Sequence, residues 1–443
     1  MSNANNNLAF RLIYLAIGLV LGALFIVLPI KYALVLTVGA GFAVFTFFQP
    51  KISYMLFFFG MLIIPYDYWN NMLILLSAFA YAAIFALNYF LDKNKGLDMK
   101  SLAPSLILFA FFSILSLFTG FGGMDSVRVF AIMFGCLIHS VLILNFIETK
   151  KDLQTLILIL AAAVALTSLF GLYQYSAGIE IKAEFTDLAQ SQGLSRLFST
   201  MANSNNDAES WVMLLPFIIA MMLTTVCDTK RVVLAGVIGL CVIALVLTYS
   251  RSGYLALLAS IGIFVLMVSP KLVPVGILAL IIMIPFLPKS LTDRLLTIGK
   301  DTSSKYRLLI WEGVLRMLKD FWITGIGMGP KAFTSIYRDY AHVNAKPAMH
   351  SHNVFLSVLA EIGIGGFISF MAYLFRTFRS GIVAQIKATD PEMKIYLAAG
   401  ISSLTAFCVF SLAEYVWFYP RVMLIFWLVT GLVLSMAKMG AER

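Results

Sequence analysis

Three of the four histidines in this chain fall within eleven residues, at His342, His350 and His352. Histidine is the side chain whose unperturbed pKa lies nearest to neutrality, and it is the commonest general base. The cluster stands where a polar stretch meets a long apolar run that begins near residue 352. This position indicates a catalytic site at a boundary between water and membrane. Zinc is the alternative, but no cysteine or acidic ligand lies nearby at a zinc-like spacing.

Three arginines are candidates for binding an anion. Arg196 precedes the polar stretch 203–207, Arg251 lies between two apolar runs, and Arg307 begins an amphipathic segment. An arginine at bilayer depth costs at least about 2.5–3.5 kcal/mol, so it usually has a partner or a task. Its planar fork fits a pyrophosphate better than lysine does. The competing interpretation of each is a snorkelling or solvated side chain. Asn205 and its neighbours suit sugar hydroxyls, or a helix cap.

Three acidic residues, Asp67, Glu361 and Glu414, lie in or near apolar runs. Glu361 follows His352 by nine residues, which in a helix places it on another face and about 13 Å deeper. We expect Glu361 to pair with a buried donor and not to act as a second catalytic carboxylate. The sequence contains no carboxylate pair with hydrolase spacing. The segments expected outside the membrane hold no DxD-like motif, which argues against a nucleotide-sugar donor.

Composition predicts the elements that must position these residues. Of the 443 residues, 61% are hydrophobic and 12% are charged, whereas a soluble domain carries about 25% charged residues. The apolar runs are long and continuous, so they predict helices and not barrel strands. We therefore expect an all-α, polytopic integral membrane protein with about 12–14 transmembrane helices in a single domain over 1–443. The runs are 9–29, 31–49, 52–66, 70–91, 102–119, 127–147, 152–175, 208–228, 231–249, 251–268, 271–287, 352–378, 392–413 and 419–437.

Lysine and arginine in the short turns predict the orientation. If the N-terminus is cytoplasmic, the basic turns and the C-terminus are cytoplasmic as well. Two long segments, 177–207 and 288–351, then face outward. The second carries ten Lys or Arg against five Asp or Glu, which suits an anionic ligand at the outer leaflet.

The segment 305–320 of the second loop has helical periodicity. Leu308, Trp311, Leu315 and Leu318 share one predicted face, which indicates a helix at the membrane interface with Trp311 as its anchor. The glycines at 325, 327 and 329 follow it, and they predict a turn because no strand precedes them as in a dinucleotide site.

Four motifs together resemble the O-antigen ligase family, which shares a polytopic fold with O-antigen polymerases and bacterial O-oligosaccharyltransferases. His352-Asn353 followed after nine residues by Gly363-Ile364-Gly365-Gly366 is similar to the family's H-[NSQ]-x9-G-x-x-[GTY] pattern. The further matches are Ser250-Arg251-Ser252-Gly253, Arg196 with Asn203-Ser204-Asn205, and Arg307 with Trp311 and Gly325-Ile326-Gly327. Ser204 stands where the family usually has proline. The first two hundred residues add only hydropathy.

The resemblance implies a GT-C-like, inverting glycosyltransferase that needs no metal cofactor. It would transfer O-antigen from undecaprenyl pyrophosphate to lipid A–core at the periplasmic face of the bacterial inner membrane, in contact with membrane lipid and with no nucleic acid. His352 would be the general base that deprotonates the acceptor hydroxyl. Arg196, Arg251 and Arg307 would bind the pyrophosphate. Asn205, Asn353 and His350 are weaker candidates for substrate binding.

Two alternatives remain open. A polymerase or a protein O-oligosaccharyltransferase would use the same donor with a different acceptor, and composition does not separate these from a ligase. A transporter would carry ionisable residues deep in its helices and symmetric broken helices, whereas the charges here gather at the expected outer face.

Overall fold

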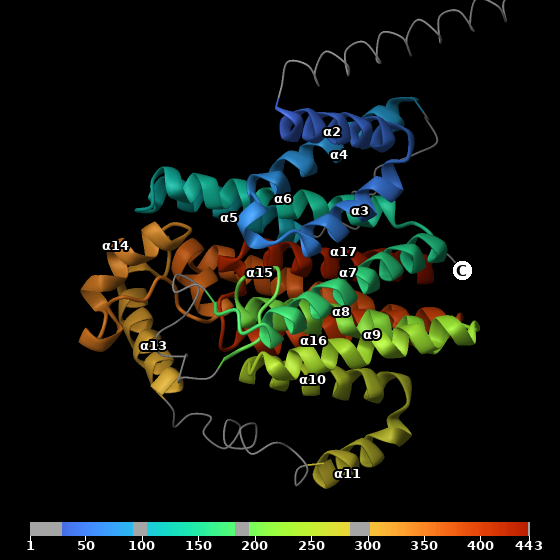
Figure 1. Ribbon diagram of the computed structural model, residues 1–443. Coiled ribbons are helices and arrows are strands. Elements are labelled where there is room, and N and C mark those ends of the chain that lie inside the picture. The colour runs from blue at the N-terminus through green and yellow to red at the C-terminus, as the bar shows by residue number, and fades with distance from the viewer. Residues whose placement is uncertain (1–28, 92–103, 182–194, 284–301, 442–443) are drawn as a thin grey trace, which may run out of the picture. The chain divides into compact units, whose positions relative to one another are not determined.

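The computed structural model describes residues 29–91, 104–181, 195–283 and 302–441, and these residues are helical with no β-strand (Figure 1). The α-helices are α2 Ile30–Phe48, α3 Pro50–Ile63, α4 Met72–Leu91, α5 Pro104–Thr119, α6 Met124–Phe146, α7 Lys150–Ser176, α8 Ser204–Thr224, α9 Asp228–Leu247, α10 Arg251–Val268, α11 Val273–Met283, α13 Thr302–Phe321, α14 Pro330–Tyr340, α15 Val354–Lys387, α16 Pro391–Ser411 and α17 Pro420–Ala441. The short 3₁₀ helices are η1 Tyr66–Tyr68, η3 Pro270–Leu272, η5 Val343–Ala345 and η6 Val416–Phe418.

The all-α, multi-pass membrane fold expected from hydropathy is confirmed. Within the described residues, eight helices (α6 to α10 and α15 to α17) are long and apolar enough to cross a membrane. Four shorter apolar helices precede or accompany them, at Thr37–Phe48, Pro50–Ile63, Met72–Leu87 and Pro104–Thr119. The expected run 9–29 lies outside the described residues. The polar stretch at the end of the first long loop belongs to α8, which begins at Ser204 and not near 208.

The chain divides into two units, 1–57 and 58–443. The described part of the first is α2 with the beginning of α3. In the second, α16 packs against α8 and α10, α17 packs against α6, and α15 packs against α5. Of the residues in the spanning windows of α8 and α17, 78% are buried, against 22% in α9. The central helices α8, α16 and α17 therefore form the core, and α9 presents most of its apolar surface outward.

Two amphipathic helices, α13 and α14, lie at one end of the second unit (Figure 1). They enclose a small apolar core that also receives η5 and Ala360 of α15. The buried face of α13 carries Ile310, Val314 and Met317, whereas Leu308 and Leu315 are exposed. Of the face predicted from the sequence, Leu318 is buried in this core, whereas Leu308 and Leu315 point away from it. The indole of Trp311 donates to the carbonyl of Ser351 at 2.9 Å, so Trp311 fixes the segment before α15.

The three glycines after α13 form more than a turn. All three have positive φ, and the backbone N–H groups of Ile326 and Gly327 donate to the carbonyls of Ala360 and Glu361 in α15, at 2.8 and 3.0 Å. These carbonyls are free to accept because α15 is interrupted at Gly363, where φ is +78°. The motif glycines on both segments thus allow two backbones to touch beside the histidine stretch.

Replacing Gly363 with alanine is expected to lower the free energy of unfolding by more than about 2 kcal/mol. Left-handed backbone is costly for an L-residue, and the close packing of Gly363 against the backbone of Ile323 is also lost. A Cβ at Gly363 would lie 2.2 Å from the carbonyl oxygen of Ile323. Thermal melting in detergent measures the effect. Gly262→Ala is the matched control, since a Cβ there meets nothing within 4 Å, and it should melt at or above the wild-type temperature. A Gly363→Ala protein that melts like wild type would contradict the close approach.

Candidate active site

His352 has an unusual backbone. It precedes the N-cap of α15, Asn353, whose side-chain oxygen accepts from the N–H of Leu356 at 3.0 Å. The φ of His352 is +51°, in the left-handed region that few residues other than glycine adopt. Its own N–H donates to Nδ1 of His350 at 3.2 Å, which helps to hold this conformation. Strain of this kind persists only where surrounding contacts impose it, and it is common at functional sites.

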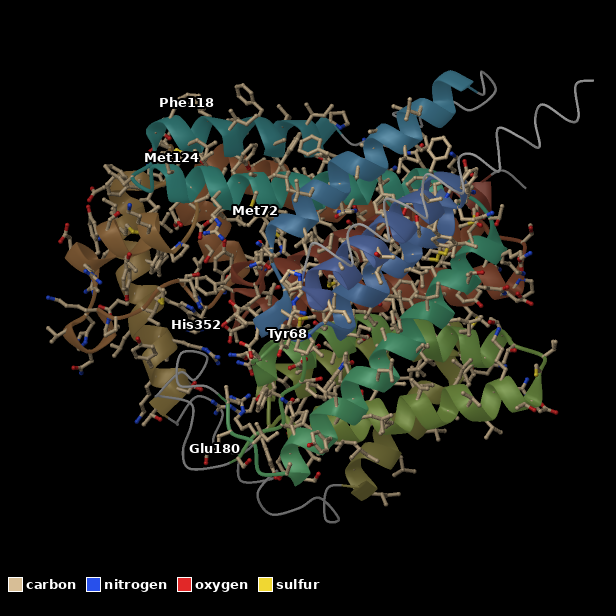
Figure 2. The ribbon with its side chains drawn as sticks, turned by 45° about the horizontal axis from the view of Figure 1, so that its top comes forward. Tyr68, Met72, Phe118, Met124, Glu180 and His352 are labelled. Atoms are coloured by element: carbon tan, nitrogen blue, oxygen red, sulfur yellow. The ribbon has the colours of Figure 1, made fainter. Side chains whose placement is uncertain are left out.

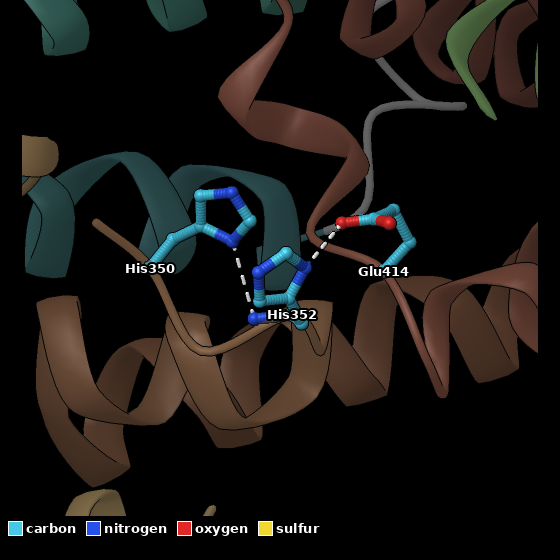
Figure 3. Close-up of side chains that lie close together, drawn as sticks. All are labelled: His350, His352 and Glu414. Carbon is cyan, nitrogen blue, oxygen red and sulfur yellow. Dashed lines mark hydrogen bonds and ion pairs between the residues drawn. The ribbon is translucent and has the colours of Figure 1, made fainter. Parts of the chain in front are cut away.

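The imidazole of His352 is oriented by Glu414, which lies between α16 and α17. Nδ1 of His352 is 2.8 Å from Oε1 of Glu414, and the exposed fractions of the two side chains are 12% and 7% (Figure 3). A carboxylate accepts here, so Nδ1 carries the hydrogen, and in the neutral tautomer with this arrangement the lone pair lies on Nε2.

Two further segments reach Glu414 through its other oxygen. The guanidinium of Arg307 donates to Oε2 at 3.2 Å, and Nδ2 of Asn205 donates to the same atom at 3.1 Å. Burial alone would raise the pKa of Glu414, but the facing His352 and Arg307 overcome it and hold this pKa well below its usual range. Glu414 is therefore a carboxylate that joins α8, α13 and the histidine stretch.

Arg196 belongs to the same network at one remove. It donates to Oδ1 of Asn205 at 2.9 Å, and through Nε to the carbonyl of Thr248 at 2.8 Å. Asn203 caps α8, as its sequence position suggested. The network now has six residues, and they come from four separate segments of the chain: Arg196 and Asn205, Arg307, His350 and His352, and Glu414.

Within the described residues, neither Arg251 nor Asn353 is a hydrogen-bond partner of Glu414. Arg251 is the first residue of α10, three residues beyond Thr248, and within the described part of the chain its side chain does not contact Glu414. Asn353 uses its amide nitrogen to reach the carbonyl of Leu412 at 2.9 Å. This bond ties the start of α15 to the turn that carries Glu414.

Residues 236–371 match a protein-family model described as O-Antigen ligase. In this segment the chain is similar to the O-antigen ligase family, which supports the resemblance drawn from the four motifs. The matched segment contains Arg251, Arg307 and the histidine pair His350 and His352, and it implies a glycosyltransferase-like ligase activity acting on lipid-linked glycan and lipid substrates in general. No curated protein matches the chain closely enough to count as a relative.

The ligase-family segment does not contain the whole network. Arg196, Asn205 and Glu414 lie outside 236–371. Glu414 nevertheless contacts His352 and Arg307 directly, Asn205 contacts Glu414, and Arg196 contacts Asn205. The geometry therefore extends the candidate site of the ligase family into α8 and into the turn before α17.

Glu361, by contrast, has the structural role expected from its position. Its carboxylate accepts from the backbone N–H of Gly329 at 3.2 Å and from the hydroxyl of Tyr415 at 3.0 Å. Both donors are buried, so Glu361 fastens the glycine-rich segment and the turn after α16 to α15.

His350, His352 and Glu414 also offer three possible metal ligands, with donor atoms all within 4.8 Å of one another. Spacing along the sequence does not reveal this set, because Glu414 is distant in the chain. The arrangement of these three side chains is better explained by the hydrogen bond between His352 and Glu414 than by a bound cation. Glu414 already accepts from Arg307, Asn205 and His352, and a metal ion would break the bond to His352 beside a guanidinium.

The contribution of His350 to stability should fall as the pH drops below about 6.5, the usual pKa of histidine. Burial and the neighbouring His352 lower the pKa of His350 well below this value. The unfolded chain therefore binds a proton at His350 that the folded protein does not bind. The contribution of His350 to stability then declines by up to about 1.4 kcal/mol per pH unit. Melting temperatures at pH 5 to 8 measure the slope. His350→Asn keeps an acceptor near the N–H of His352 and should reduce this loss.

His342→Asn provides the control for that experiment. His342 is exposed, and its Nδ1 accepts the N–H of Asn344 at 3.2 Å, a role that asparagine can also fill. This variant should keep the wild-type slope. Equal slopes in all three proteins would contradict a neutral, buried His350.

Proposed function

We propose that this protein transfers O-antigen polysaccharide from undecaprenyl pyrophosphate to a sugar hydroxyl of lipid A–core, with His352 as the general base and no metal ion. The observation that carries the proposal is the 2.8 Å contact between His352 and Glu414 in a buried network that also holds Arg307. The ligase-family segment supports the reaction class. The reaction would take place on the outer side of the inner membrane.

In this mechanism the acceptor hydroxyl gives its proton to Nε2 of His352 while its oxygen attacks the anomeric carbon. Glu414 holds the ring through the Nδ1 hydrogen and stabilises the imidazolium that forms, as the acid of a Ser-His-Asp triad does. The bond from the anomeric carbon to the pyrophosphate breaks, and its electron pair leaves with the pyrophosphate. Attack from the opposite face inverts the anomeric centre.

The leaving group requires positive charge, and Arg307 is placed to supply it. Its side chain is 13% exposed and bonds Glu414 through one terminal nitrogen. Its Nε is buried with no hydrogen-bond partner. A buried donor without an acceptor is costly, and a pyrophosphate oxygen would satisfy it. Arg196, which donates to the carbonyl of Thr248, and Arg251, at the start of α10, would complete the anion site.

A transfer assay with purified protein tests the proposal. Lipid-linked glycan is incubated with lipid A–core, and the product is resolved by mass on a gel. We expect glycan joined to lipid A–core, with the anomeric configuration inverted in the product. Chain extension of the lipid-linked glycan without lipid A–core would identify a polymerase. Modification of an added peptide acceptor alone would identify a protein O-oligosaccharyltransferase.

The same assay tests the metal-free mechanism. EDTA should leave the rate within about twofold of the control, since no step uses a cation. Added Zn²⁺ should inhibit if it occupies the His350, His352 and Glu414 atoms, because it removes the free base. Loss of transfer in EDTA with recovery on adding one metal would overturn the metal-free proposal.

A further inference from the structure

The turn between α3 and α4 carries an exposed aromatic ring beside a carboxylate. The side chain of Tyr68 is 82% exposed, and Asp67 before it is also exposed (Tyr68 is labelled in Figure 2). Residues 58–71 contain no lysine or arginine. A ring of this size so fully uncovered has a large apolar face and a polar edge available to a ligand.

The turn is firmly fixed by Arg421 of α17, which is 3% exposed. Its guanidinium donates to the carbonyls of Met61 and Ile64 at the end of α3, at 3.1 and 2.6 Å. It also lies 5.5 Å from the ring centre of Trp69, within cation–π range. The exposed ring of Tyr68 thus sits on a rigid support, and little ordering is needed on binding.

The same arginine connects this turn to the candidate active site. Arg421 donates to the carbonyl of Thr200 at 2.6 Å, and the hydroxyl of Thr200 donates to the carbonyl of Leu62 at 2.6 Å. Thr200 stands four residues after Arg196 and five before Asn205, the two residues that lead to Glu414. Asp207 holds this loop from the other side by accepting from the N–H of Ser199 at 2.7 Å. Arg421 and Thr200 therefore tie the turn to the segment 196–205, which carries two residues of the network.

We propose that Tyr68, with Asp67 beside it, forms a subsite for a sugar ring of a glycan substrate, at a distance from the reacting bond. A pyranose has an apolar C–H face that packs on an aromatic ring and a rim of hydroxyls that donate to a carboxylate. The inference rests on the proposed glycan transfer. Tyrosine and tryptophan also anchor proteins at membrane interfaces. Arg421 beneath the turn is buried, and residues 58–71 add no basic side chain to its exposed side. This does not suit an anionic lipid surface and favours the neutral, hydroxyl-rich ligand.

Kinetics of Tyr68→Ala with substrates of different glycan length test the subsite. The KM for a substrate with a long glycan should rise about three- to tenfold, the size of one aromatic packing contact. The maximal rate and the KM for a single-sugar version should not change. Shortening the donor and the acceptor glycan in turn shows which of them reaches Tyr68. Tyr68→Phe keeps the ring and should retain most of the affinity.

Phe118→Ala is the matched control, because Phe118 at the end of α5 is also 82% exposed (Figure 2). An equal loss in both alanine variants would indicate membrane anchoring and overturn the subsite, as would unchanged KM values in Tyr68→Ala. Saturation-transfer NMR with the free, water-soluble glycan provides a readout without catalysis. Signal in wild type that disappears in Tyr68→Ala supports the subsite even if transfer to lipid A–core is not observed. Transfer by wild type with no such difference would overturn the subsite alone.

Discussion

Replacing His352 with asparagine is expected to lower the rate of glycan transfer by at least about 10²-fold, the usual contribution of a general base. Asparagine is one of the few residues that tolerate positive φ, and His352 has a φ of +51°. Its amide can still donate to Glu414, so the variant removes the base and keeps the backbone. Initial rates with saturating donor and acceptor measure the effect, and the melting temperature checks the fold.

His352→Ala should lose activity to the same degree but should also melt earlier, because alanine tolerates left-handed backbone less well than asparagine. His342→Asn, at an exposed position outside the network, should transfer glycan at the wild-type rate. A folded His352→Asn protein with near-normal activity would remove His352 as the base and leave His350 as the remaining candidate.

Replacing Glu414 with glutamine should be nearly as damaging, although only one atom changes. Glutamine presents an oxygen on one side and an amide on the other, whereas Glu414 accepts on both, from His352 and from Arg307 with Asn205. If the oxygen faces Arg307, the amide donates to Nδ1 of His352 and moves the ring hydrogen to Nε2. The base is then in the wrong tautomer. The same change in a Ser-His-Asp triad lowers kcat about 10⁴-fold.

We expect a fall of about 10² to 10⁴ in kcat with a small change in KM, since the substrate does not bind Glu414 directly. Glu361→Gln is the control, because Glu361 is equally buried and accepts from Tyr415 and Gly329 but holds no imidazole. A Glu414→Gln enzyme with wild-type kcat would show that His352 needs no oriented tautomer.

The motifs of the sequence predict which residues lie together, but not the carboxylate that connects them. His352, Arg307, Arg196 and Asn205 are brought together as the motifs suggested, because motif residues on one side of the membrane are confined to a thin layer. Glu414 was noted only as an acid near an apolar run. The runs 392–413 and 419–437 flank it, and with the expected orientation they place it on the same side as the histidines. That signal was sufficient to bring it into the site.

Other features depend on packing that a single sequence does not encode locally. The sequence predicts an apolar face of α13 through Leu308 and Trp311, but two overlapping stripes of the helix are apolar. Packing against Phe333 and Tyr337 of α14 selects the stripe with Ile310 and Val314. The interruption of α15 at Gly363 could not be predicted from the sequence either. A glycine within an apolar run is compatible with a continuous helix, and only the approach of a second backbone shows otherwise.

The position of Glu414 between the last two spanning helices has a consequence for biosynthesis. His352 and Arg307 are made and can enter the membrane before residue 414 leaves the ribosome, since domains form from the N-terminus during synthesis. Until α17 follows, the histidine has no carboxylate to fix its tautomer. We therefore expect chains that end before residue 414 to remain inactive, because their histidine has no carboxylate partner.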